Sequence, residues 1–272
     1  MRRPLVAPAV ALALTLAASL PSAAQDRSTK LEVVQATTSL SSGPVAVGVD
    51  FDVLCSGWIS GPDDRFPGEI VGAQTVDSQS IFMEGDIVYL NLGARSGVAP
   101  GQEFWVVRPA ETVWDPRSEF RSFGRFYETP ARLKVICVQE QTSIAELTAS
   151  CADAQLGDRI LPFEPIPIPL VRSTARKTLC DPPNGKTVGE IIRVKDRAVP
   201  IGQESIVYLD LGEADGIQPG QFLTVFRSHR SVPGVRTVLG EVAVLSLRDT
   251  TAVAKVTYSR DVMYAGDSVE VK

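Results

Sequence analysis

Residues 85–108 read GDIVYLNLGARSGVAPGQEFWVVR, and residues 204–227 read ESIVYLDLGEADGIQPGQFLTVFR. Twelve of these 24 aligned positions are identical without a gap. The identical positions include a tyrosine, Tyr89 or Tyr208, and a Pro-Gly-Gln turn in each copy. The chain therefore contains an internal repeat.

The repeat extends beyond these two stretches in both directions. Upstream, residues 68–71 match residues 189–192, and downstream, residues 133–147 match residues 242–256. Both copies close on a Gly-Asp pair, at residues 157–158 and 266–267. Two copies of one unit indicate tandem domains, because a solenoid needs more repeats to bury a continuous core.

Each copy has the pattern of β-strands. Val88, Leu90 and Leu92 alternate with Ile87 and Tyr89, and the second copy repeats the scheme. This alternation is typical of strands that bury at least one face. The glycines and proline that follow suit a tight connection, since glycine tolerates a positive φ and proline restricts φ. With roughly five or six short strands a copy and no long amphipathic helix, we expect an all-β protein of two small barrel-like or sandwich-like domains.

A proline-rich stretch lies between the copies. Its prolines recur at every second or third position, which favours an extended, semi-rigid linker; they are Pro162, Pro165, Pro167 and Pro169. The expected organisation is a signal peptide, an N-terminal β domain with an extension, a linker and a C-terminal β domain. Their boundaries are 1–24, 25–161, 162–178 and 179–272.

The first residues have the pattern of a secretory signal peptide. Arg2 and Arg3 precede an uncharged Ala/Leu-rich run at residues 5–20, and small residues then suit cleavage after Ala24. The alternative is a retained membrane anchor, but the run is short for a span of roughly 20 residues. We expect an exported protein, periplasmic, outer-membrane-associated or extracellular, and not an integral membrane protein.

Four cysteines lie in the expected mature part: Cys55, Cys137, Cys151 and Cys180. An exported chain meets an oxidising compartment, so we expect structural disulfides or buried thiols. The spacing contains no C-x-x-C pair, which argues against zinc and thioredoxin-like chemistry. All three connectivities of two disulfides stay open.

No motif carries catalytic chemistry. The one histidine, His229, follows a strand and is expected in an exposed loop. The sequence contains no Gly-x-Ser-x-Gly elbow, no phosphate-binding loop and no calcium loop. A net charge of −5 argues against nucleic acid, since phosphate binding needs a basic face. We expect no catalytic residue, no cofactor and no metal site.

The order of strand, Leu-Gly-x-x-x-Gly-[Val/Ile]-x-Pro-Gly-Gln turn, strand, hairpin and closing Gly-Asp resembles the C-terminal domain of the flagellar assembly protein T family. It is also similar to modules of bacterial envelope proteins that often carry LysM peptidoglycan-binding domains. The resemblance covers roughly residues 85–160 and 204–269 and rests on turn and strand positions. It implies a periplasmic protein, and flagellar members build a ring around the basal body. The chain departs from the flagellar protein by carrying two copies, and no LysM signature is visible in it.

These observations favour a non-enzymatic cell-envelope protein, a structural or protein-interaction module acting as a scaffold or adaptor in a flagellar or peptidoglycan context. The alternative is an unrecognised exported hydrolase. The repeat favours the scaffold, because its matching positions serve folding and no nucleophile pattern recurs. The expected partner is another envelope protein or a second copy, with peptidoglycan contacted only indirectly.

An insertion in the first copy is the candidate docking element. Val135 lies 29 positions after Val106 in the first copy, whereas Val244 lies 19 positions after Val225 in the second. Asp-Pro at residues 115–116 predicts the start of a short helix, on which three arginines would share a face. Arginine and aromatic residues are enriched at interfaces. The candidate docking residues are Trp114, Arg117, Phe120, Arg121, Phe123, Arg125, Phe126 and Tyr127. The alternative is that the aromatics cap their own barrel.

Overall fold

The computed structural model describes residues 43–61, 64–74, 80–172, 178–179, 181–229, 231–232 and 234–272. The expected signal peptide and Cys180 lie outside the described residues. Residues 42–272 group into one compact unit, and the following description concerns that unit.

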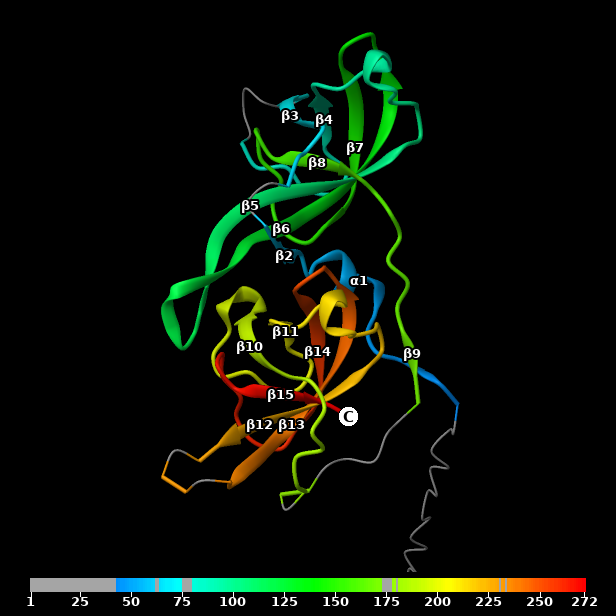
Figure 1. Ribbon diagram of the computed structural model, residues 1–272. Coiled ribbons are helices and arrows are strands. Elements are labelled where there is room, and N and C mark those ends of the chain that lie inside the picture. The colour runs from blue at the N-terminus through cyan, green and yellow to red at the C-terminus, as the bar shows by residue number, and fades with distance from the viewer. Residues whose placement is uncertain are drawn as a thin grey trace, which may run out of the picture. The chain divides into compact units, whose positions relative to one another are not determined.

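Almost all regular structure in this unit is β, and it forms two closed barrels (Figure 1). The strands of the first barrel, with β2 added at its edge, are β2 (Trp58–Ser60), β3 (Gly68–Ala73), β4 (Ile87–Leu90), β5 (Glu103–Asp115), β6 (Ser118–Val138), β7 (Ser143–Ser150) and β8 (Arg159–Pro162). Those of the second are β10 (Val188–Val194), β11 (Ile206–Leu209), β12 (Phe222–Ser228), β13 (Arg236–Leu247), β14 (Ala252–Ser259) and β15 (Ser268–Val271).

The two barrels have the same topology. The first has the order β6-β5-β8-β3-β4-β7 and closes through pairing of β6 with β7. The second has the order β13-β12-β15-β10-β11-β14, which is the same order strand for strand. Neighbouring strands pair antiparallel throughout. The predicted all-β fold is confirmed, and of the two predicted architectures the barrel is the observed one.

A few short elements complete the unit. They are β1 (Val45–Ala46), which pairs with β9 (Leu170–Val171), the helix α1 (Asp50–Leu54), and the 3₁₀ turns η1 (Ala94–Ser96), η2 (Lys195–Arg197) and η3 (Glu213–Asp215).

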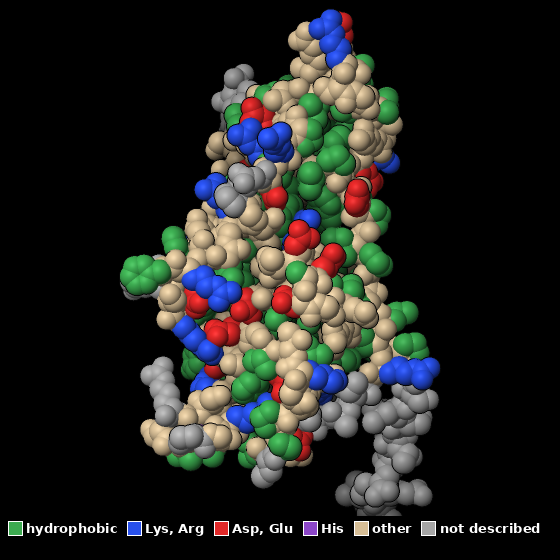
Figure 2. All heavy atoms as spheres, in the orientation of Figure 1, with side chains coloured by type: hydrophobic (Ala, Val, Ile, Leu, Met, Phe, Trp, Pro, Cys, Tyr) green, Lys and Arg blue, Asp and Glu red, His purple; other side chains and the backbone are tan. Residues whose placement is uncertain are grey.

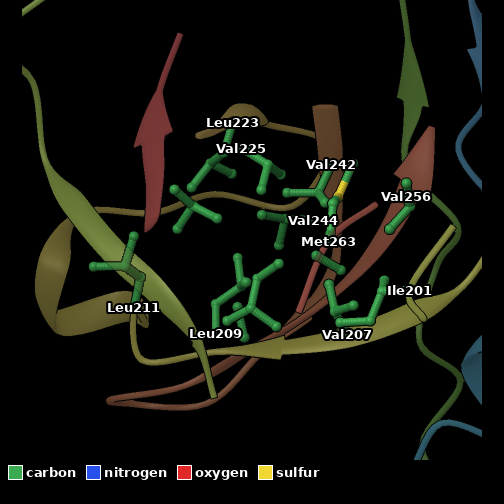
Figure 3. Close-up of a cluster of buried hydrophobic side chains, with 14 of the residues drawn as sticks. Ile201, Val207, Leu209, Leu211, Leu223, Val225, Val242, Val244, Val256 and Met263 are labelled. Atoms are coloured by element: carbon green, nitrogen blue, oxygen red, sulfur yellow. The ribbon is translucent and has the colours of Figure 1, made fainter. Parts of the chain in front are cut away.

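The interior of each barrel is filled by the inward residues of the alternating pattern. In the second barrel Val207 and Leu209 are fully buried in this core, together with residues of the other strands (Figure 3). Val88 and Leu90 occupy the equivalent places in the first barrel and are also fully buried. The alternation in the sequence therefore sets which residues face the barrel interior.

Steric constraints explain why the repeated turn contains glycine at these positions. Gly97 and Gly216 end the turns η1 and η3 with φ values of 78° and 75°, in the left-handed region that favours glycine. A Cβ on Gly93 would lie 2.5 Å from the carbonyl oxygen of Gln139, and one on Gly212 would lie 2.4 Å from that of Asp249. These turns therefore pack directly against the next hairpin of their own barrel.

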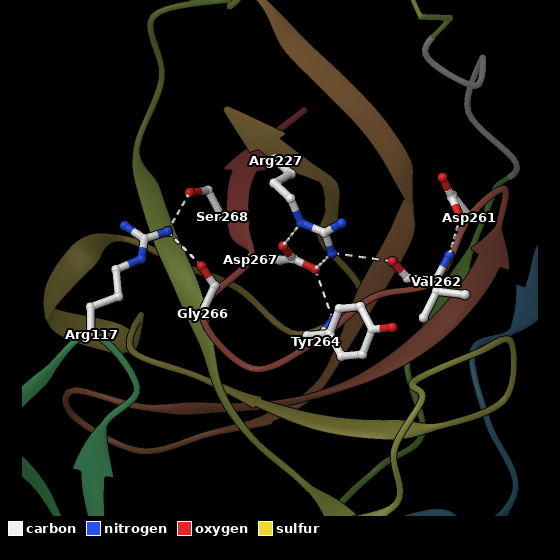
Figure 4. A network of polar contacts seen from close by, with 8 residues as sticks. All are labelled: Arg117, Arg227, Asp261, Val262, Tyr264, Gly266, Asp267 and Ser268. Carbon is white, nitrogen blue, oxygen red and sulfur yellow. Dashed lines mark hydrogen bonds and ion pairs between the residues drawn. The ribbon is translucent and has the colours of Figure 1, made fainter. Parts of the chain in front are cut away.

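The closing Gly-Asp pair of each copy supplies a buried carboxylate that forms an ion pair with an arginine. The Arg227 guanidinium donates two hydrogen bonds of 2.7 Å to the carboxylate of Asp267, which also accepts one from the Tyr264 backbone N–H (Figure 4). In the first barrel Arg108 donates to Asp158 at 2.8 and 2.7 Å, and Asp158 accepts from a backbone N–H in the same way. These hydrogen bonds raise the pKa of both arginines above the ordinary value, against the opposing effect of burial. The repeated Arg and Asp therefore stabilise each barrel.

The cysteines form one disulfide among the described residues. Cys55, just after α1, is bonded to Cys151 at the end of β7. Cys137 is an exposed free thiol. A disulfide is therefore present as expected, but the expectation of a bridge or a buried site at Cys137 is wrong, because its β6 position faces solvent.

Candidate interaction site

The insertion of the first copy is a β-hairpin and not a helix. It consists of the end of β5 and the start of β6, in which Trp114 pairs with Ser122 and Asp115 with Ser118. The Asp115 carboxylate accepts a 2.7 Å hydrogen bond from the Arg117 backbone N–H, which makes Asp-Pro the turn of the hairpin. The predicted short helix is wrong, because β5 and β6 continue their barrel pairing to the tip and the Asp side chain closes a turn instead of capping a helix.

The hairpin tip contacts the second barrel. The Arg117 guanidinium forms an ion pair with Glu190 of β10, and it donates to the Gly266 carbonyl and, at 3.1 Å, to the Ser268 hydroxyl (Figure 4). Burial raises the pKa of Glu190, against the opposing effect of Arg117. This contact joins the insertion to the closing Gly-Asp turn of the second copy.

An aromatic and charged cluster lies at the root of the hairpin. Phe126 is 4% exposed and its ring packs edge-on against Tyr208 of β11, with centroids 5.2 Å apart. The Arg193 guanidinium lies 3.8 Å from the Phe126 ring centroid and donates a 2.9 Å hydrogen bond to Glu111 of β5. Burial opposes ionisation of Glu111, but the hydrogen bonds from Arg193 and Arg197 prevail and lower its pKa to about 2. The cluster therefore combines buried aromatic rings with an ion pair between Arg193 and Glu111.

The segment around α1 covers the rest of the same face of the second barrel. Asp52 accepts a 2.7 Å hydrogen bond from Lys255 of β14. The Tyr208 hydroxyl donates to the Ser56 carbonyl, and the Thr251 hydroxyl donates to that of Ile59 at 2.7 Å. The Cys55–Cys151 disulfide ties this segment to the first barrel. The hairpin and the α1 segment together form what we call the inter-barrel contact.

The candidate docking residues divide between this contact and the free surface. Phe126 and the partly buried Phe123 pack in the inter-barrel cluster, while Tyr127 is buried against Trp58 of the first barrel. Arg121 lies over the Phe123 ring at 4.6 Å, and Arg125 is exposed. The tip leaves Phe120 97% exposed and Trp114 55% exposed.

The sequence reasoning missed the receiving residues of the second barrel. Arg193, Tyr208, Lys255 and Glu190 form that surface, and they lie in β10, β11 and β14. The identical tyrosines of the two copies pointed to a contact surface, because Tyr208 is an outward residue of an alternating strand. Only the tertiary contact shows what covers it.

The one histidine, His229, lies in the loop after β12. Its side chain is exposed between β12 and β13, and Nδ1 accepts a 3.3 Å hydrogen bond from the Ser231 backbone N–H. In the described part of the chain no group of three or more His, Cys, Asp or Glu side chains is placed to hold a metal ion. No helix within the same residues is long and apolar enough to cross a membrane.

The comparisons with known proteins concern the first barrel. No curated protein matches the chain. Residues 85–162 run from the turn before β4 to the end of β8. This segment matches the family model of the flagellar assembly protein T, C-terminal domain, and the first barrel is therefore similar to that domain.

Proposed function

We propose that this chain is an exported, non-enzymatic protein of the cell envelope that acts as a scaffold or adaptor in flagellar assembly. The observation that carries the proposal is the match of the first barrel to the C-terminal domain of flagellar assembly protein T. The Cys55–Cys151 disulfide supports an oxidising compartment such as the periplasm. The repeated ion pairs support a role in folding for the best-matching residues.

The hairpin tip is the proposed docking site for another envelope protein. Its inner residues are used within the chain, whereas Phe120 and Trp114 offer two large aromatic side chains to a partner. Buried aromatic anchors carry much of the binding energy in protein interfaces. The residues Arg121 and Arg125 beside them supply a basic rim in an otherwise acidic protein.

Two further proposals concern processing and organisation. The leader is cleaved after Ala24, and residues 162–178 connect domains at 25–161 and 179–272. N-terminal sequencing of the exported protein tests the first statement, and a start at Met1 would contradict it. Expression of residues 179–272 alone tests the second, and an unfolded fragment would contradict it.

The docking proposal is tested on flagellar basal bodies isolated from the native bacterium. The wild-type chain should be retained on them, and the double variant Trp114→Ser/Phe120→Ser should lose about tenfold or more of this retention. The matched control is Phe51→Ser, an exposed aromatic residue outside the hairpin (55% exposed). Absence of the wild-type chain would overturn the flagellar role, and equal retention of all three would overturn docking through the tip.

A further inference from the structure

The repeat allows the outer faces of the two barrels to be compared residue by residue. On the second barrel this face consists of outward residues that are between 0% and 6% exposed, because the inter-barrel contact covers them; they are Ile192, Ile206, Tyr208, Ala243, Leu245 and Val253. The equivalent residues of the first barrel are Val71, Ile87, Tyr89, Lys134, Ile136 and Ile144. We call these the first-barrel face.

Apart from Lys134, the first-barrel face is apolar, and it is uncovered. Val71 is 49% exposed and Ile136 is 51% exposed, whereas their equivalents Ile192 and Leu245 are 4% and 1% exposed. Figure 2 shows hydrophobic side chains gathered on the surface of the first barrel. Exposed apolar patches of this kind mark interaction sites on soluble proteins.

A cavity opens on this face. It has a volume of about 410 Å³ and is lined by Val71, Gly72, Tyr89 and Ile144, among others. Gly72 is the equivalent of Arg193, whose side chain lies between Phe126 and Tyr208 on the second barrel. The space beside Tyr89 is therefore open where the second barrel supplies its own side chain, and a partner side chain has room to stack there.

The polar groups of this face also differ from those of the second barrel. The Tyr208 hydroxyl donates to the Ser56 carbonyl, but the Tyr89 hydroxyl has no hydrogen-bond partner among the described residues. Glu146 occupies the position of Lys255, the residue that binds Asp52 of the α1 segment. Glu146 is exposed and has no ion-pair partner in the described part of the chain. Glu146 thus carries the opposite charge to its equivalent Lys255, and it lies directly across the β6–β7 pairing from Lys134, where the second barrel has Ala243.

We propose that the first-barrel face is a second docking site, separate from the hairpin tip, that takes a β-hairpin or extended segment of a different protein. By analogy with the inter-barrel contact, the segment presents an aromatic side chain among aliphatic ones, which enters the cavity beside Tyr89. It carries a lysine or arginine opposite Glu146, and a backbone carbonyl accepts from the Tyr89 hydroxyl.

A second copy of this chain is a poor occupant. Its α1 segment would place Asp52 opposite Glu146, and like charges directly opposed are unfavourable. Its long hairpin is already held on its own second barrel through Arg117 and Phe126. The occupied hairpin, together with the acidic Glu146 in place of Lys255, therefore favours a different protein over a second copy.

Site-specific photo-cross-linking of the full-length chain in the native bacterium tests the proposal. A benzophenone amino acid replaces Val71 or Ile136, and the matched control position is Val199 of the second barrel, which is 71% exposed. We expect a discrete cross-linked protein from both face positions and none from the control. Mass spectrometry should map the cross-link to a segment with an aromatic residue and a nearby Lys or Arg.

The second part of the test changes the charge at position 146. Glu146→Lys should lower the cross-linked yield at Val71 by about tenfold, while Glu213→Lys on the second barrel should leave it unchanged. The Trp114→Ser/Phe120→Ser variant should also leave it unchanged, so failure of the hairpin-tip site is told apart from failure of this one. Cross-linked dimers of the chain, cross-links to a segment without a basic residue, or no specific product would overturn the proposal.

Discussion

The two barrels share a core and a topology but differ in what their outer faces contact. Both bury the same inward strand residues and contain the same Arg–Asp ion pair. The second barrel receives the hairpin of the first at Glu190, whereas the equivalent Glu69 is held by Arg159 of its own barrel. Ser268 is the equivalent of Arg159. In the second barrel Glu190 therefore forms its ion pair with Arg117 of the hairpin instead of with a residue at that position. The difference teaches that inward residues specify the barrel and outward residues specify its contacts.

The largest effect is expected where the barrels are alike. Asp158→Ala and Asp267→Ala each leave an arginine without its carboxylate, and the loss for Asp158→Ala should be about 3 kcal/mol, because breaking a largely buried ion pair leaves an unpaired charge. Asp158→Ala should cost more, because the Arg108 side chain is 24% exposed and that of Arg227 is 45% exposed. Urea unfolding measures both. Asp261→Ala, an exposed control, should stay within about 0.5 kcal/mol of wild type, and equal stability of all variants would show that the repeated pair is not needed for the fold.

The next largest effect should be a difference in stability loss between the covered face of the second barrel and the exposed face of the first. Leu245→Ala removes a side chain buried in the inter-barrel contact and should destabilise the chain by about 2 kcal/mol. Ile136→Ala changes the equivalent residue of the first-barrel face, which is half exposed, and should cost less than about 0.5 kcal/mol. The same unfolding measurement applies to both. Equal losses for the two variants would contradict the assignment of one face as covered and the other as free.

The smallest effect concerns pH. The folded pKa of Glu111 is about 2, below its ordinary value of 4.5, so its ion pair stabilises the inter-barrel contact fully above pH 4.5. This contribution is lost as the pH falls from 4.5 towards 2, when the carboxylate takes up a proton. The difference in unfolding free energy between wild type and Glu111→Gln should therefore be constant near neutral pH and narrow in acid. Glu84→Gln, on the first barrel, controls for the change in net charge, and a difference that widens in acid would exclude the assigned ion pair.

Much of the fold could be predicted from local patterns. Period-two alternation identified β4 and β11 and their buried residues, and the glycines and prolines identified the turns between strands. The same reasoning failed at residues 115–124, because Asp-Pro suits both a helix start and a hairpin turn. Pairing of β5 with β6, a contact between strands, decides between the two. The pairing of Cys55 with Cys151 was open for the same reason, since it joins residues 96 apart.

Local sequence patterns specify the repeat, the β-strands, the turns and the inward residues, because each depends on neighbours along one strand or within one turn. Contacts between distant segments bring Arg117, Phe126 and Glu111 onto the second barrel and leave Phe120 and Trp114 exposed. An outward residue such as Tyr89 or Tyr208 has the same local pattern in both copies. Whether it is buried depends on segments far away in the sequence, such as those of Phe126 and Ser56 for Tyr208, and local patterns hold no information about those contacts.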